Sequence, residues 1–262
     1  MGITNWIKNL GSNTLYYPGC LTKGILKREH ENYKEIFNIL GIDFIMFPDK
    51  EVCCGLPVLN GGYKKDAKQL ARKNFELFKK NNIKKIITNC PSCYHMFSDY
   101  YPKLIKEWDI KVEHVSVTIL NALRKNNLNF DNASKEIVTY HDPCHLGRYS
   151  KIYDEPRKVI EMLGGKIIEM KHNKESSLCC GGGGGMRANF PEIAKKEAER
   201  RVAETPSQAE KIISPCGLCF SNLKSAGAVE LNGGRGVIKS SEELSEEFSS
   251  FVLRKLKEIK RT

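Results

Sequence analysis

The 262-residue sequence predicts an α/β fold made of two duplicated parallel-sheet halves that are related by an approximate internal two-fold axis. Two observations indicate this class. One pattern of five cysteines occurs twice along the chain, and short apolar runs of strand length alternate with longer amphipathic stretches. Alternation of this kind favours parallel strands with helices packed on the faces of the sheet.

The cysteine spacing defines the repeat. In the first half, 32 residues separate the first cysteine from an adjacent Cys-Cys pair, and 35 more lead to a Cys-x-x-Cys motif. The gaps in the second half are 34 and 35 residues, which makes coincidence very improbable. The predicted domains are therefore residues 1–124 and 135–262, with the polar residues 126–134 as a linker. The two sets are Cys20, Cys53, Cys54, Cys90 and Cys93, and Cys144, Cys179, Cys180, Cys216 and Cys219.

Each half is expected to begin with a short buried strand, at 15–17 and at 137–140, that ends near its first cysteine. A helix follows, with its apolar face over 33–40 in the first half and a counterpart over 156–163, which Gly164 and Gly165 stop. A second strand is expected at 44–47 and at 166–170.

The Cys-Cys-Gly loop should then open a basic helix of about four to five turns. A third strand, at 83–88 and at 211–214, delivers the Cys-x-x-Cys motif. Ser240 and Glu243 form a capping-box pattern, which predicts a last amphipathic helix that carries Leu244, Phe248, Val252, Leu256 and Ile259. The cysteines then gather at the carboxyl ends of the strands, where open parallel sheets bind ligands.

Composition narrows the function. The net charge is +11, but the lysines are interspersed with glutamates and no aromatic-basic motif occurs, which indicates a solvated surface rather than a nucleic-acid site. The chain has no run of about 18 apolar residues and no secretory signal. We therefore expect a cytoplasmic protein, associated with membranes only through a partner subunit. Ten reduced, regularly spaced cysteines indicate metal binding rather than disulfides.

The spacing favours iron–sulfur clusters over zinc. Structural zinc usually takes four ligands, often from two Cys-x-x-Cys motifs, whereas each half offers five thiols and one such motif. Adjacent cysteines can reach different irons of one cluster, and the glycine tract 181–185 could leave N–H groups free to bond cluster sulfides. The common ferredoxin run of four closely spaced cysteines is absent. Zinc remains the structural alternative at this point.

The pattern resembles the cysteine-rich CCG domain, which occurs twice in B- and D-type subunits of heterodisulfide reductases and in iron–sulfur subunits of glycolate, lactate and glycerol-3-phosphate oxidising systems. The resemblance covers residues 15–256. It is closest in the second half, in the segments His141-Asp142-Pro143-Cys144-His145-Leu146-Gly147-Arg148 and Cys179-Cys180-Gly181-Gly182-Gly183-Gly184-Gly185-Met186-Arg187.

The resemblance implies that each cysteine set holds a noncubane [4Fe-4S] cluster, with all ten cysteines as ligands. Both clusters would face one site that reduces a small disulfide to two thiols. His145 is the candidate proton donor to a leaving thiolate, or alternatively a hydrogen-bonding neighbour of a ligand. Arg148, Arg187 and the glycine tract could hold an acidic substrate. His141 and His95 are expected to support the fold or the ligands.

Two departures from the family leave alternatives open. D-type relatives carry a ferredoxin-like region that this sequence lacks, so electrons are expected from a ferredoxin-like subunit or a flavoprotein. The first half has Cys54-Gly55-Leu56-Pro57 in place of polyglycine, which keeps zinc in that half as the fallback. A non-catalytic electron-transfer subunit of a flavin-dependent dehydrogenase is the alternative function, because the cysteines would serve either role.

Overall fold

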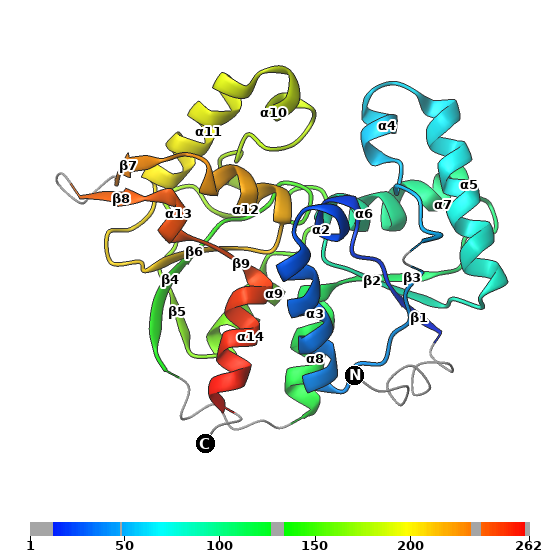
Figure 1. The fold of residues 1–262 in the computed structure, drawn as a ribbon, viewed down its shortest axis with the longest axis horizontal. Coiled ribbons are helices and arrows are strands. Elements are labelled where there is room, and N and C mark those ends of the chain that lie inside the picture. Colours follow the sequence, from blue (N-terminus) through cyan, green and yellow to red (C-terminus); the bar gives the residue numbers. More distant parts are fainter. Residues whose placement is uncertain (1–12, 48, 127–133, 232–236, 260–262) are drawn as a thin grey trace.

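A computed structural model describes residues 13–47, 49–126, 134–231 and 237–259, and it contains two parallel sheets (Figure 1). The first sheet has the order β1-β2-β3, with β1 at Thr14–Tyr16, β2 at Lys85–Thr88 and β3 at Lys111–His114. The second has the order β5-β4-β6-β9, with β4 at Glu136–Tyr140, β5 at Gly165–Ile167, β6 at Lys211–Ser214 and β9 at Ser245–Glu247. The predicted α/β class with duplicated parallel-sheet halves is confirmed.

The two sheets share one strand order once Ile45 is included. Its backbone forms a parallel bridge with Leu15, with hydrogen bonds of 2.9 Å from Tyr16 N to Ile45 O and from Ile45 N to Thr14 O. Ile45 therefore stands beside β1 as β5 stands beside β4. The strand predicted at 44–47 is reduced to this bridge, because one residue alone pairs with β1. The strand predicted at 166–170 begins at Gly165 and ends at Ile167.

Four long helices pack between the sheets. They are α3 at Lys27–Leu40 and α8 at Val115–Lys125 from the first half, and α9 at Asp154–Met162 and α14 at Phe248–Ile259 from the second. Helix α3 packs on α14, and α8 packs on α9 (Figure 1). One apolar core therefore joins Phe37 of the first half to Val159 and Val252 of the second. These contacts are reciprocal, as a two-fold relation requires; the axis and the boundaries 1–124 and 135–262 stay predictions.

The other helices surround the cysteines. The predicted basic helix after each Cys-Cys-Gly loop is present, but a short helix precedes it in both halves: α4 (Leu56–Asn60) precedes α5 (Lys64–Lys80), and α10 (Met186–Asn189) precedes α11 (Pro191–Ala203). Other short elements are α2 (Cys20–Gly24), α6 (Pro91–His95), the π-helical turn η1 (Met96–Tyr100), α7 (Tyr101–Leu104), the 3-10 turn η2 (Lys174–Ser176), α12 (Gly217–Lys224) and the hairpin of β7 (Ala228–Glu230) and β8 (Ile238–Ser240).

The predicted last helix from Ser240 onward is wrong in its first part. The Ser240 side chain makes no capping hydrogen bond, and a single turn, α13 (Ser241–Leu244), is followed by the strand β9. Residues 245–247 pair with the edge of β6, because that edge offers backbone partners that a continuing helix would leave unused. Helix α14 then buries Phe248, Val252 and Leu256 as the pattern predicted. Most of the predicted linker, 127–133, lies outside the described residues.

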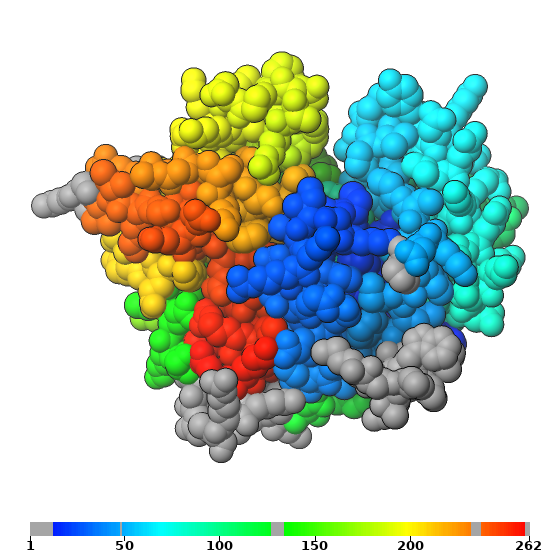
Figure 2. Space-filling model, viewed as in Figure 1, coloured from blue at the N-terminus to red at the C-terminus, as the bar shows by residue number. Residues whose placement is uncertain are grey.

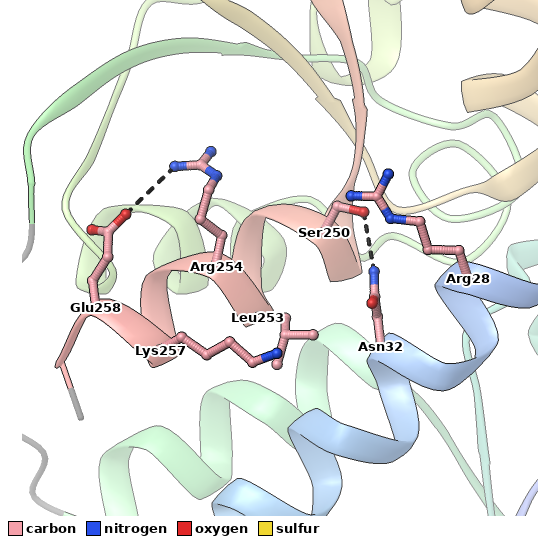
Figure 3. A pocket seen from close by; sticks show the side chains of 7 residues that line it. All are labelled: Arg28, Asn32, Ser250, Leu253, Arg254, Lys257 and Glu258. Carbon is pink, nitrogen blue, oxygen red and sulfur yellow. Dashed lines mark hydrogen bonds and ion pairs between the residues drawn. The ribbon is translucent and has the colours of Figure 1, made fainter. Parts of the chain in front are cut away.

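A surface pocket lies on the seam between α3 and α14 (Figure 3). Most of its charges are already paired. Arg254 contacts Glu136 at 2.9 Å and Glu246 at 3.1 Å, and Lys257 contacts Glu35 at 2.8 Å. The pocket therefore marks where the halves are joined rather than a ligand site. Its lining is Arg28, Asn32, Ser250, Leu253, Arg254, Lys257 and Glu258.

None of the helices in the described part of the chain combines the length and the apolar character that a bilayer-spanning helix requires.

Candidate metal centre

Four of the ten cysteines follow directly from the carboxyl ends of strands. Cys20 begins α2 after β1, and Cys144 lies in the turn after β4. Cys90 and Cys216 occupy the N-cap positions of α6 and α12, after β2 and β6. Because parallel strands end at a common edge, each sheet brings its first cysteine and its Cys-x-x-Cys motif together, as predicted.

The first set converges. Thiol contacts link Cys20 to Cys53, Cys53 to Cys54, and Cys54 to Cys93, which also contacts Cys90. Gly19 makes this approach feasible. It has a φ of 78°, and a Cβ added there would lie 3.2 Å from the Cys93 Sγ atom. A side chain at this position would push the first cysteine away from the third segment.

The second set converges in the same way. Cys179 contacts Cys180, the Sγ atoms of Cys180 and Cys219 lie 3.1 Å apart, and Cys219 contacts Cys216. Cys144 lies near the thiols of Cys180 and Cys216. All ten cysteines carry free thiols, so no disulfide competes with metal binding.

Backbone amides of the glycines point at the thiols. The Gly55 N–H lies 3.4 Å from the Cys53 Sγ atom, and the Gly181 N–H lies 3.3 Å from that of Cys179. The Gly182 N–H lies 3.4 Å from the Cys180 Sγ atom. Amides in these positions stabilise thiolates and cluster sulfur. The first two glycines of the tract therefore direct their N–H groups to cysteine thiols, and their bonding to cluster sulfides stays a prediction.

The second cysteine of each adjacent pair has a lowered pKa, and so does Cys90 of the first set. Contacts with Cys53 and then Cys93 lower the pKa of Cys54 to about 5. Contacts with Cys179 and then Cys219 hold the pKa of the equivalent Cys180 well below its usual range. The thiolate is the form that binds metal, so each set holds at least one thiol that favours this form. By contrast, burial raises the pKa of Cys144 to about 11.

A buried ion network holds the loops of the second set. Asp142 accepts two hydrogen bonds from the Arg157 guanidinium, at 2.7 and 2.8 Å, and one from the Lys174 N–H at 2.8 Å. Arg157 also donates to Glu169 at 2.6 and 2.9 Å. Asp142 thereby fixes the turn that carries Cys144 against the segment that leads to Cys179.

The main-chain oxygens of the inner cysteines are also bonded. Tyr101 Oη donates to Cys54 O at 3.0 Å, and Asn74 Nδ2 donates to Cys53 O at 3.1 Å. In the second half, Asn222 Nδ2 donates to Cys180 O at 2.5 Å. The sequence-based predictions missed Asn74, Tyr101 and Asn222, because nothing in the local pattern marks an amide or phenol in a helix as a partner of a distant loop.

Imidazole and phenol rings join the two sets. His95 follows Cys93 by two residues, and His145 follows Cys144; their ring centroids lie 5.8 Å apart. Tyr149 stacks on His95 at 5.2 Å and lies 5.1 Å from His145. The His145 Nδ1 atom lies 3.5 Å from the Cys144 Sγ atom, and burial lowers the pKa of His145. The residue named as a proton donor therefore lies between the two thiol sets.

A notch separates the lobe of α10 and α11 from the lobe of α4 and α5 on the molecular surface (Figure 2). The loops that carry the adjacent cysteine pairs lead into α4 and α10, one on each side of it (Figure 1). Gly217, beside Cys216, lies against Leu26 and Leu21, which follows Cys20. The two thiol sets are therefore neighbours rather than remote sites.

The two arginines predicted to hold a substrate differ in their contacts. Arg148 NH1 donates to Ser177 O at 2.5 Å and to Glu175 O at 3.4 Å, so this guanidinium braces the loop before Cys179. Arg187 lies in α10 after the glycine tract. Its side chain is exposed, and its role toward a substrate stays a prediction.

The donor set fits an iron–sulfur cluster. Five soft thiols in each half, with amides aimed at three of the sulfur atoms, are what a thiolate-bound inorganic cluster requires. A tetrahedral zinc ion would leave one thiol of each set unused. Together with Cys180 and Cys219, His141 forms a three-residue group whose ligand atoms lie within 4.8 Å of one another.

Comparison with known proteins agrees with this geometry. A family model described as a cysteine-rich domain, CCG, matches residues 14–98 and 138–224. The chain is 35% identical over 218 residues to the D-type subunit of the dihydromethanophenazine:CoB--CoM heterodisulfide reductase of Methanosarcina mazei, and 32% identical to its counterpart in Methanosarcina acetivorans; both matches cover 81% of this chain and 53% of the relative.

A third relative has a different name. The chain is 30% identical over 219 residues to the EtfAB:quinone oxidoreductase of Syntrophomonas wolfei, a match that covers 80% of this chain and 30% of that protein. The chain spans about half the length of the heterodisulfide reductase subunits that it matches.

Proposed function

The chain belongs to the CCG cysteine-rich domain family, and from this premise we propose that it is the catalytic subunit of a heterodisulfide-reductase-like complex. The reaction takes one disulfide, two electrons and two protons to two thiols. The electrons would be held on two noncubane [4Fe-4S] clusters, one in each half. The ligands would be the two sets of five cysteines named above.

The observation that carries this proposal is the contact between His95 and His145, with ring centroids 5.8 Å apart. It brings the Cys93 end of one thiol set against the Cys144 end of the other. A disulfide has two sulfur atoms that leave as separate thiols, and two adjoining sets offer one position for each. A simple relay needs only a path for electrons and gives no reason for paired imidazoles at the junction.

Residues of the chain supply the other requirements of the reaction. Bound clusters would supply single electrons. His145 would donate a proton to a leaving thiolate, Tyr149 and His95 would hold its ring, and Arg187 would attract an acidic substrate. The electrons would come from a ferredoxin-like subunit or a flavoprotein.

Metal content gives the first test. The full chain, purified without oxygen, should contain about eight irons and a similar amount of acid-labile sulfide, the content of two four-iron clusters. A thiol added to the oxidised protein should change its electron paramagnetic resonance spectrum, because the cleaved product binds at the site. Stoichiometric zinc without iron would overturn the proposal.

The cysteine assignment has its own test. Cys180→Ser should remove the signal of the second-half cluster, and Cys54→Ser that of the first-half cluster, with about half of the iron retained in each variant. The two variants are matched, because the residues hold equivalent places and both are buried. Iron retained in full in both would refute the assignment.

Turnover tests the catalytic role. With reduced viologen as electron donor, the loaded chain should reduce a mixed disulfide of two acidic thiols. His145→Gln should slow this reaction by about 100-fold or more at unchanged iron content, the effect expected for loss of a general acid. Equal rates in the variant and the parent would leave His145 only a hydrogen-bonding role toward Cys144.

The similarity to the EtfAB:quinone oxidoreductase supports a second candidate, a non-catalytic iron–sulfur subunit that passes electrons from a flavin-dependent dehydrogenase. It predicts reversible cluster reduction by a reduced flavoprotein without disulfide reduction. A thiol should then leave the electron paramagnetic resonance spectrum unchanged. The viologen assay and the thiol titration together separate the two candidates.

A further inference from the structure

His141 and Tyr17 occupy equivalent places beside the two thiol sets. The N–H of His141 donates to Ile213 O at 3.0 Å at the end of β4, and the N–H of Tyr17 donates to Ile87 O at 2.8 Å at the end of β1. The backbone is thus the same, but an imidazole stands where the other half has a phenol. Any difference between the two sites begins with these side chains.

A guanidinium fixes the imidazole of His141. Arg201 Nε donates to His141 Nδ1 at 3.0 Å, and Arg201 is itself fully buried, with NH1 bonded to Glu204 at 2.6 Å and to His172 O at 2.7 Å. A guanidinium has no acceptor. The lone pair of the imidazole must therefore be on Nδ1, and in the neutral ring the proton is on Nε2.

That Nε2 atom is buried, and among the residues that the structure describes it has no hydrogen-bond partner. The nearest candidates are sulfur atoms, since the ligand atoms of His141, Cys180 and Cys219 lie within 4.8 Å of one another. Burial of an unpaired N–H would cost free energy without a partner. A thiolate or cluster sulfur is the acceptor that this position offers.

The same contact excludes His141 as a metal ligand. A histidine that binds metal through one nitrogen normally donates the other N–H to a carboxylate, a carbonyl or water. Here the second nitrogen faces a donor, Arg201, so a metal on Nε2 would leave the ring without any proton. The geometry suits an N–H donor to sulfur.

The first half has no equivalent donor among its described residues. The Tyr17 hydroxyl donates to Val52 O at 2.5 Å and is thereby directed to the backbone. Ala67 lies against Gly55 as Ala194 lies against Gly181, so these two alanines hold equivalent places in their helices. About two turns further along, the position that Arg201 holds in the second half is occupied by Asn74 in the first. Asn74 is neutral and donates to Cys53 O and to Tyr101. Backbone donors are matched, since Gly55 and Gly181 face the first thiol of each adjacent pair and the amides of Leu56 and Gly182 face the second, Cys54 and Cys180.

We infer that His141, positioned by Arg201, donates an N–H hydrogen bond to the ligand sulfur of Cys180 or Cys219 and gives the second-half cluster a higher reduction potential than the first-half cluster. This inference depends on the proposed iron–sulfur function. Donors to sulfur and nearby positive charge stabilise the more negative, reduced cluster. Electrons that enter the protein therefore collect in the second half, beside His145.

A redox titration of the loaded full chain tests the inference. Cys54→Ser and Cys180→Ser assign the two electron paramagnetic resonance signals. His141→Phe should lower the ratio of reduced to oxidised second-half cluster about tenfold at a fixed potential, equal to about 59 mV for one electron. His141→Gln, whose amide keeps a donor, should restore part of it. Tyr17→Phe is the matched control and should change neither signal, because the Tyr17 hydroxyl donates to the main-chain oxygen of Val52.

Each of the other outcomes overturns either the inference or the proposed function. Unchanged potentials in His141→Phe with full iron overturn the inference and leave the proposed function intact. Loss of about half the iron in His141→Phe makes His141 a ligand and also overturns it. Zinc in place of iron in the parent removes the proposed function itself.

Electron–nuclear double resonance on the parent, with ¹⁵N-labelled histidine, keeps the test open if the variant fails to fold. A weakly coupled, exchangeable proton at the second-half cluster supports the inference, and a strong ¹⁵N coupling or no exchangeable histidine proton refutes it.

Discussion

Glu247 lies buried where the two halves meet. Its carboxyl accepts hydrogen bonds from the Tyr33 hydroxyl at 2.7 Å and from the Ser249 N–H at 2.6 Å, and it is 2% exposed. Burial raises the pKa of Glu247 from 4.5 to about 7. Tyr33 belongs to α3 of the first half and Glu247 to β9 of the second, so protonation of this one carboxyl bears on how the halves hold together.

The sign of the pH effect follows from linkage. Below pH 4.5 the carboxyl is protonated in both states, and between pH 4.5 and 7 the folded chain holds a proton that the unfolded chain has released. The free energy of unfolding should therefore fall as pH rises through this window, by about 3 kcal/mol in all.

Thermal unfolding checks the prediction for Glu247. Between pH 5 and pH 8 the Tm of the parent should fall by roughly 6 to 12 °C relative to that of Glu247→Gln, which cannot ionise. Glu76→Gln, on the outer face of α5, should follow the parent. A parent and a Glu247→Gln variant with parallel pH profiles would contradict the assignment.

Arg157 gives a second prediction for a single residue. It pairs with the buried Asp142 and with Glu169. Arg157→Leu should reduce the free energy of unfolding by about 3 kcal/mol, because removal of one partner leaves a buried charge unpaired. Urea unfolding measures the loss.

The matched control for Arg157 is Lys103→Leu. It removes a cation from an exposed pair with Asp99 and should change stability by less than about 1 kcal/mol. Equal effects of the two substitutions would mean that Asp142 is not held by Arg157.

For single residues, the sequence predicts the cysteine ligands but not the side chains that hold the ligand loops in place. The ten cysteines could be found because their spacing repeats and because adjacent thiols have few other uses. Arg201 and Asn74 could not, since each acts on residues of a distant segment; Arg201 lies 60 positions from His141. Asp142 lies within the His-Asp-Pro-Cys segment that carries the family resemblance. No sequence pattern around Arg157 indicates that it pairs with Asp142.

The helices and strands differ in how well the sequence predicts them. Helices α3 and α14 bury the apolar positions that periodicity assigned to them, because a helix must bury one continuous face. Strands β3 and β9 went unpredicted. Residues 245–247 read Ser-Glu-Glu, which has low strand preference, and the free edge of β6 decides their conformation. A three-residue edge strand depends on its neighbour more than on its own side chains.

The Cys-Cys-Gly loop of the second half permits a test at the scale of an element. Gly181 has a φ of 78°, and an added Cβ would lie 2.5 Å from Ala194 O in α11. Gly181→Ala should therefore force the loop away from α11, lower the free energy of unfolding by about 3 to 5 kcal/mol and reduce the iron content by about half.

Gly183→Ala is the control for this loop, since its added methyl group would meet only Leu218 at 4.0 Å. It should keep full iron and parental stability within about 1 kcal/mol. In the first half, Gly55→Ala should be milder than Gly181→Ala, because the corresponding approach to Ala67 O is 3.5 Å. If these glycines served only chain flexibility, urea unfolding would not show the largest loss of stability for Gly181→Ala, a smaller loss for Gly55→Ala and the smallest for Gly183→Ala.

The whole molecule is not a pair of independent domains that follow one another along the chain. The repeat correctly predicts two units of one architecture, but it does not reveal that they share a core. Duplication fixes which residues are equivalent, whereas contacts between α3 and α14 and between α8 and α9 arise only after both units are folded. The thiol sets adjoin because these helix pairs hold the sheets side by side.

This shared core predicts that neither half folds alone. Separation would expose Ile36 and Phe37 of α3 together with Phe251 and Val252 of α14, all fully buried in the intact chain. Their burial contributes about 1.5 to 3 kcal/mol each, which is comparable with the total stability of a small domain. Residues 1–126 and 134–262, each expressed alone, should bind a hydrophobic dye and lack cooperative unfolding.

Co-expression supplies the control for the separated halves. The two fragments together should form a one-to-one complex that unfolds cooperatively, because the helix pairs re-form between chains. A cooperative transition in either fragment alone would show that the boundary between the halves is a true domain boundary, and the site between them would then depend on a docking contact that could open. Joint folding instead keeps the two thiol sets at a fixed separation, which a reaction that uses both sets on one disulfide requires.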